Sequence, residues 1–192
     1  MIDSIATKSL KADSVISNQT LGTPGAVGIS IQEYGDGRDV TTVITLDEYP
    51  VMALAGAAAA LGGGNTVYTF PAGAHVELVY YQSISLKAAG TAVAVDLGLG
   101  SVISSGVISV LSGTATFEDR LTGQATTTSS TGGTAVAALL GATAGVLTGI
   151  SLNVAASVKA VFLNAAATWN ANNTGNLTAD GTIVLKWTKM SA

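Results

Sequence analysis

The strongest fold signal in this 192-residue chain is the stretch TIVLKWT at residues 182–188. Ile183, Leu185 and Trp187 point to one side of an extended chain, and the residues between them point to the other. Such alternation is typical of a β-strand with one buried face, because successive side chains of a strand lie on opposite sides. The preceding Asp180-Gly181 pair is typical of a turn. The C-terminal part of the chain is therefore predicted to be a strand that enters from a turn.

The same alternation recurs towards the N-terminus, where each alternating run is bounded by Gly, Asn, Asp or Pro. Eight or more short strands at this spacing predict an all-β fold, an antiparallel β-sandwich or jelly-roll-like core. Two Ala-rich pieces, Val51–Leu61 and Thr134–Ala144, are expected to be short helices or irregular loops, since Ala has the best helix propensity. The other alternating runs are 27–31, 40–46, 66–70, 76–86 and 93–99.

Residues 1–26 differ in composition from the rest of the chain. They mix Ser, Asp, Lys, Asn and Thr with few apolar residues and end in the turn-rich Gly22-Thr23-Pro24-Gly25. We predict an extended N-terminal arm at 1–26 and a β-sandwich or jelly-roll domain at 27–192. The first residues, Met1–Ile5, lack a basic region followed by an apolar one, so no secretory signal is expected.

Charge is scarce: Lys and Arg number 8 and Asp and Glu number 12, together 10% of the residues. About a quarter is usual for a soluble domain. So few basic residues cannot form a phosphate-binding surface, so no nucleic-acid partner is expected. The absence of cysteine excludes disulfides and thiolate metal sites. A β-rich chain with so little charge favours a subunit whose surface is covered by protein, above all in the uncharged stretch 121–158 and the arm.

The uncharged stretch also raises the question of a membrane helix. Residues 135–150 contain Gly141-x-x-x-Gly145, a helix-packing spacing in membranes. The apolar run is shorter than the roughly 20 residues that a spanning helix needs, and Thr143 and Thr148 interrupt it. We therefore predict a buried or interface segment and no membrane partner.

A search for chemistry finds no convincing catalytic, cofactor-binding or metal site. His75 is the only histidine, and no Cys is present, so a transition-metal site has no ligand set. His75 is expected to be a strand residue at a sheet edge or a subunit contact. The triple glycine at 62–64 is expected to be a turn, and it is not a P-loop, because no Lys-Ser or Lys-Thr follows it. We predict that the protein is not an enzyme and needs no cofactor.

The acidic residues leave two further hypotheses. Glu33, Asp36 and Asp39 could hold Ca²⁺ through oxygen ligands, but a hairpin turn is favoured because Gly and Asp suit tight turns. A β-sandwich hydrolase would need Glu33, Asp36, Asp39 or His75 to share a cleft. Glu118-Asp119-Arg120 is expected to be a solvated turn.

Several segments together resemble small virion structural proteins of tailed bacteriophages. The resemblance is carried by pattern and composition over most of 27–188 and by no catalytic motif, so no site residue is transferred. It implies a capsid decoration or cement protein on the virion surface, made in the host cytoplasm, that binds the major capsid protein. Such proteins have jelly-roll or related β folds and often form trimers, so a homotrimer is expected first and a dimer second. The segments are Glu33–Gly37, Val40–Leu46, Val67–Ala74, Val95–Gly100 and Leu177–Leu185.

A second function within the virion stays open at this point. A tail, fibre or head-fibre adhesin would bind a host glycan or surface protein through exposed aromatic or Asn-rich loops. The best candidate loop is Trp169–Asn173, in which Trp169 could stack on a sugar. A Trp that packs into the core is the commoner case and is favoured for this residue.

Overall fold

The computed structural model of the chain describes residues 22–25, 27–36, 38–56, 59–130, 136–138 and 159–189. These residues form ten β-strands and one short 3-10 helix, η1 (Ala115–Phe117), and contain no α-helix. The predicted all-β fold is confirmed. The strands are β1 (Thr23–Pro24), β2 (Ile29–Gly35), β3 (Asp39–Ala55), β4 (Ala60–Phe70), β5 (Ala74–Lys87), β6 (Ala94–Gly100), β7 (Leu121–Ser129), β8 (Val136–Ala138), β9 (Lys159–Thr168) and β10 (Thr174–Lys189).

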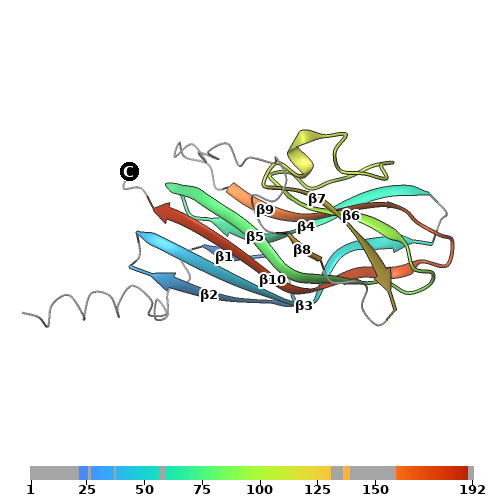
Figure 1. Cartoon of the computed structure of the whole chain (residues 1–192), viewed down its shortest axis with the longest axis horizontal. Helices are drawn as coiled ribbons and strands as arrows, with labels where there is room; N and C mark the ends of the chain where they lie inside the picture. Colours follow the sequence, from blue (N-terminus) through green and yellow to red (C-terminus); the bar gives the residue numbers. More distant parts are fainter. Residues whose placement is uncertain are drawn as a thin grey trace, which may run out of the picture.

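One continuous sheet connects the strands in the order β1-β4-β9-β6-β7-β5-β10-β3-β2, and β8 pairs with β5 beside this path. The sheet folds back on itself, so that β2, β3, β10 and β5 face β1, β4, β9 and β6 (Figure 1). Neighbouring strands are antiparallel except β5 and β7, which pair in parallel through Leu86 with Thr128 and Lys87 with Ser129. The strand pair β5–β7 therefore joins the two layers.

The core lies between the two layers and is built from the predicted alternation. Ile183, Leu185 and Trp187 of β10 are buried and pack with inward residues of the facing layer, among them Leu97 and Leu99 of β6. The rings of Trp187 and Phe70 meet edge to face, with centroids 5.8 Å apart. The inward-facing residues of β10 thus line one side of the hydrophobic core.

A buried polar chain also crosses the core. The Tyr68 hydroxyl donates a hydrogen bond of 2.5 Å to Glu33 Oε1, and Trp187 Nε1 donates one of 2.9 Å to Thr42 Oγ1. The Thr42 hydroxyl in turn lies 3.5 Å from Glu33 Oε1. Burial, reinforced by the bond to Glu33, raises the pKa of Tyr68 far above its ordinary value, so its hydroxyl remains a donor. Glu33 is therefore a structural acceptor that links β2 to β4.

The Ala-rich segment Val51–Leu61 shows where sequence propensity misleads. Residues 51–55 end β3 and residues 60–61 begin β4, so the helical option predicted for this segment is wrong. Pairing with β10 and β9 stabilises the extended chain and overrides the helix propensity of Ala. β3 and β10, at 17 and 16 residues, are also much longer than the short strands predicted. In the other Ala-rich segment, Thr134–Ala144, only β8 belongs to the described residues.

The predicted arm and the uncharged stretch fall largely outside the described residues. Residues 1–21 and 26 of the arm lie outside them, whereas Thr23 and Pro24 pair with Thr69 and Tyr68 of β4. Of the stretch 121–158, β7 and β8 are described. Leu121, Thr126 and Thr128 of β7 are buried. The proposed role of the two segments in subunit contacts stays a prediction.

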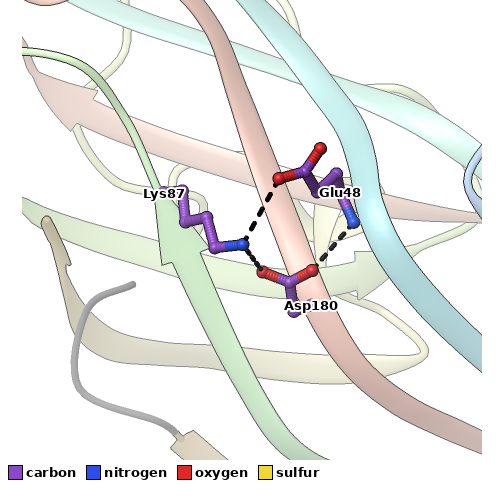
Figure 2. A network of polar contacts seen from close by, with 3 residues as sticks. All are labelled: Glu48, Lys87 and Asp180. Carbon is purple, nitrogen blue, oxygen red and sulfur yellow. Dashed lines mark hydrogen bonds and ion pairs between the residues drawn. The ribbon is translucent and has the colours of Figure 1, made fainter. Parts of the chain in front are cut away.

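Three neighbouring strands are tied together by a polar network on the layer that contains β10. Figure 2 shows Asp180 of β10 between Glu48 of β3 and Lys87 of β5. Asp180 Oδ1 accepts the Glu48 backbone N–H at 2.8 Å, and Lys87 Nζ lies 2.8 Å from Asp180 Oδ2 and 3.6 Å from Glu48 Oε1. Asp180 Oδ2 is buried and has no hydrogen-bond partner, but the Lys87 ammonium 2.8 Å away offsets the energetic cost of burying this charged oxygen.

The backbone around this network is irregular. Glu48 has a φ of 49°, in the left-handed region that non-glycine residues rarely adopt. The register between β10 and β3 shifts on both sides of Thr178–Ala179. Asp180 therefore fixes a bulged, strained part of the sheet by satisfying the N–H group of the strained residue.

The variant Asp180→Asn tests this network through its pH dependence. Burial alone would raise the pKa of Asp180, but the Glu48 N–H and the Lys87 ammonium outweigh it and lower the pKa below 3.8. A carboxyl whose pKa is lowered in the folded state stabilises the fold above its unfolded pKa, and this contribution is lost as pH falls through the folded value. We expect the variant to lose about 1 kcal/mol of unfolding free energy at pH 7.

Urea unfolding of both proteins between pH 7 and pH 2 measures the effect. The stability difference should shrink below about pH 4, where the wild-type carboxyl takes up a proton. Asp47→Asn, at an exposed position of β3, is the control and should behave like the wild type. A difference that stays constant over the whole pH range would show that the charge of Asp180 is not what stabilises the bulge.

Candidate functional site

The acidic segment after β2 forms a hairpin turn. Asp36 Oδ1 accepts the backbone N–H groups of Asp39 and Arg38 at 2.9 and 2.8 Å, and these two bonds lower the pKa of Asp36. The turn joins β2 to β3, which pair from Gly35–Val40 onward without a register shift. The prediction of a hairpin turn is confirmed, and one oxygen of the Asp36 carboxylate is engaged by the backbone of the turn.

The residues of the hydrolase hypothesis are not brought together. Glu33 is buried against Tyr68, on the inner side of its layer. Asp39 and His75 both pair with Thr188, one on each side of β10, and the Thr188 hydroxyl donates to Asp39 Oδ1 at 3.0 Å. Thr188 follows the buried Trp187, so this row lies on the outer side. Glu33 therefore cannot share a cleft with Asp39 and His75, and no group of three metal-ligating side chains occurs among the described residues.

The loop proposed for sugar stacking is also a structural element. Trp169 is 3% exposed and donates its Nε1–H to the Leu61 carbonyl at 3.1 Å. It continues the inward series of Ala165 and Ala167 at the end of β9. Asn173 is fully buried and donates to the carbonyls of Ala89 and Thr91. The favoured prediction that Trp169 packs into the core is therefore confirmed, and the hypothesis that it stacks on a sugar is wrong, because strand alternation directs its side chain inward.

The most distinctive surface element is the connection between β6 and β7, residues 101–120. It is far longer than an ordinary hairpin loop, and loops of this length inside compact domains usually carry function. In Figure 1 it is the yellow-green segment with the 3-10 helix η1, on the side of β9, β6 and β4 that faces away from the other layer. We refer to residues 101–120 as the β6–β7 loop.

The sheet beneath this loop is shaped to receive it. Asn164 of β9 pairs with Gly64 of β4 on one side and with Gly98 of β6 on the other. A Cβ at position 64 would collide with Asn164 Oδ1, and one at position 98 would lie 3.1 Å from the Leu111 side chain. Glycine on both neighbouring strands therefore leaves Asn164 open to the loop backbone.

Asn164 holds the loop through all of its amide groups. Its Oδ1 accepts the Ser104 N–H at 2.9 Å, and its Nδ2 donates to the carbonyls of Val102 and Phe117 at 2.8 and 2.7 Å. Asn164 is fully buried although it lies on the outer side of β9. One side chain of the sheet thus fixes both halves of the loop.

Apolar and acidic side chains complete the attachment. The Ile108 side chain occupies the space where Gly62 has no Cβ, and the fully buried Leu111 lies against Gly98. Asp96 Oδ2 accepts the Leu111 N–H at 2.7 Å. Asp119 accepts the N–H and the hydroxyl of Ser101 at 2.7 and 2.8 Å. The loop is therefore well ordered by contacts along its whole length.

This ordered loop presents apolar side chains to solvent. Among the side chains that the structure describes, the exposed large apolar ones are Val27 and four residues of the loop. Val107 is the most exposed of the four, at 84%. We call the four the apolar loop face: Val102, Ile103, Val107 and Val110.

Sequence reasoning missed this site, although signals were present. Residues 101–117 carry no charge and repeat Val-Ile-Ser at 102–104 and 107–109, yet they lack the alternation of a strand. The interpretation of Glu118–Arg120 as a solvated turn is partly wrong, because Arg120 is 7% exposed while Asp119 is exposed. The triple glycine at 62–64, expected to be a turn, lies inside β4.

Comparison of the chain with family models, with curated proteins and with solved structures finds no match. No helix among the described residues is both long enough and apolar enough to cross a membrane. The functional argument therefore depends on the geometry of the β6–β7 loop.

The variant Asn164→Ala tests how the loop is held. It leaves the carbonyls of Val102 and Phe117 and the Ser104 N–H without their partner, at a cost of about 2–4 kcal/mol of unfolding free energy. Hydrogen exchange should become faster at Ser104, while amides in β10 keep most of their protection. Asn172→Ala, at an exposed Asn that bonds Thr91, is the control. Unchanged exchange at Ser104 in Asn164→Ala would contradict this account of the loop.

Proposed function

We propose that this chain is a non-enzymatic structural protein of a bacteriophage virion, a decoration or cement protein that binds and stabilises the shell of major capsid protein subunits. The resemblance carried by segments such as Val40–Leu46 and Val67–Ala74 supports this class. The all-β fold agrees with it. The low charge of the chain also agrees, because surface that is covered by a partner needs few charged groups.

The observation that carries the proposal is the apolar loop face. Four large apolar side chains gather on one loop of a chain whose other described large apolar side chains, apart from Val27, are shielded. An apolar cluster of this kind on a soluble surface marks a contact with another protein. The proposed contact is with the shell.

The way the loop is held suits a permanent contact. Because Asn164 and Asp119 already order the loop backbone, binding does not have to order it again. The apolar side chains then transfer from water to a partner surface at about 25 cal/mol per Å². Many copies on a repeating shell would add such contacts between neighbouring subunits, and a homotrimer, the proposed form of the protein, would amplify a modest affinity per site.

The adhesin hypothesis has lost its specific support. Its candidate loop places Trp169 and Asn173 in the interior, which leaves no aromatic side chain of Trp169–Asn173 for a sugar. We therefore do not pursue it as a second function.

Binding to particles tests the proposal. Phage particles produced from a genome with the coding sequence deleted are mixed with the purified chain and sedimented. We expect saturable binding, regular density on the shell by electron cryo-microscopy, and greater resistance of the particles to heat. A chain that stays in the supernatant, or density on the tail only, would overturn the proposal.

A matched pair of substitutions tests the apolar loop face within the same assay. Val107→Asp should weaken binding at least roughly a hundredfold, because it places a charge in the centre of an apolar contact. Val27→Asp changes a valine of equal exposure, 88%, that lies before β2 on the other layer, and should bind like the wild type. Both variants should unfold at nearly the wild-type temperature, since neither side chain is packed. Equal binding by the two variants would remove the β6–β7 loop from the interface.

A further inference from the structure

The β6–β7 loop ends in a buried charged side chain. Burial lowers the pKa of Arg120, and the charge of Asp119 opposes this effect only in part. Arg120 is 7% exposed, and its Nε atom is fully covered and has no hydrogen-bond partner. Among the described residues, the ion pairs within 4.0 Å involve Lys87 and not Arg120. A guanidinium that is removed from water in this way is destabilising unless another group neutralises it.

The carboxylates nearest in the sequence are engaged elsewhere. Asp119 accepts both hydrogen bonds from Ser101, and Glu118 Oε2 accepts the Gly123 N–H at 2.6 Å. Asp96, on the neighbouring strand, accepts the Leu111 N–H. All three carboxylates thus order the backbone of the loop and its flanks, and among the described residues none of them forms a close ion pair with Arg120.

Arg120 and the apolar loop face belong to the same loop. The Ser101 and Val102 N–H groups bond the Thr116 carbonyl, and the Arg120 N–H bonds the Leu99 carbonyl at 2.9 Å, so the two ends of the loop lie together at the C-terminal end of β6. Val102 and Ile103 follow directly after this junction. Exposed aliphatic side chains near a desolvated arginine are the combination found at the energetic centre of protein interfaces.

We infer that Arg120 binds a carboxylate of the protein partner that covers the apolar loop face. The occupant is an Asp or Glu side chain set beside an apolar patch, because an apolar partner alone would bury the guanidinium still further without neutralising it. Arginine suits this role, since its planar group pairs with a carboxylate through two parallel hydrogen bonds. The inference rests on the proposed function for the identity of that partner, the shell subunit.

The variant Arg120→Met tests the inference because it should move stability and binding in opposite directions. A methionine fills a similar volume without charge, so the isolated chain should be as stable as the wild type or more stable. Binding to the particles should weaken roughly tenfold or more, because the partner's carboxylate is then buried without a counterion. Arg38→Met removes the same charge at an exposed turn and is the matched control, with binding expected to stay at the wild-type level. If Arg120→Met binds as tightly as Arg38→Met while the wild type binds, the inference is overturned and the proposed function stands.

A second experiment does not require phage particles. Nuclear magnetic resonance of the ¹⁵N-labelled full chain follows the Arg120 Nε–H signal during titration with acetate and, separately, with inorganic phosphate. The inference expects acetate to shift this signal and to leave that of Arg38 unchanged. A shift with acetate in a chain that binds no particles would retain the carboxylate site and end the proposed function. No shift with acetate, or a shift with phosphate only, would overturn the inference, the second result pointing to a phosphate-bearing ligand such as a nucleic acid or a lipid.

Discussion

The amide of Asn164 is the contact on which the functional surface depends. It lies in the middle of a five-strand layer, and glycines on both neighbouring strands allow the β6–β7 loop to approach it closely. Three backbone groups of the loop pair with this one side chain, so the loop is ordered although it contains only a single turn of 3-10 helix. Buried polar contacts of this kind specify a unique arrangement, because every alternative leaves a donor or acceptor unpaired. The side chains of Ile108 and Leu111 add apolar contacts between the loop and the sheet, and the amide of Asn164 determines where on the sheet these contacts form.

The two sides of the layer that contains β9 therefore have different tasks. Its inward residues, such as Leu163 and Ala165, pack in the core with β10. On its outward side Asn164 lies between Gly64 and Gly98, and this part is covered by the chain's own loop rather than by water. Small residues are usually weak strand formers, but here they make room for a second layer of backbone.

The sequence was most informative where the deciding contacts are local. Alternation over 182–188 predicted β10 and its buried residues, since the period of two records which side faces the core. Gly62–Gly64 was misread as a turn because the reason for these glycines is Asn164 and Ile108, far away in the sequence. Val51–Leu61 was misread in part because strand pairing with β10 and β9 outweighs the preference of Ala for helix. Arg120 shows the same limit for the candidate site: the sequence places it in an expected solvated turn, and only the tertiary fold buries it. Trp169 continues the alternation of the inward-facing Ala165 and Ala167, which indicates that its side chain faces the core. This alternation is a weak signal in the sequence, because alanine is too small to mark a buried position clearly.

The acidic side chains connect the composition of the chain to its proposed role. Asp36, Asp96, Asp119 and Asp180 each accept a backbone N–H group at a turn, a loop or a bulge. These four carboxylates thus stabilise irregular backbone. An ordered loop can present Val107 and its neighbours without the entropic penalty of ordering a flexible segment, so a contact of few residues can persist. Arg120 differs from these carboxylates, because among the described residues it forms no ion pair within 4.0 Å and its Nε has no hydrogen-bond partner. A buried charge left unpaired beside a rigid apolar surface is understandable in a subunit whose stable state is the assembled one, in which the partner completes what the isolated chain lacks.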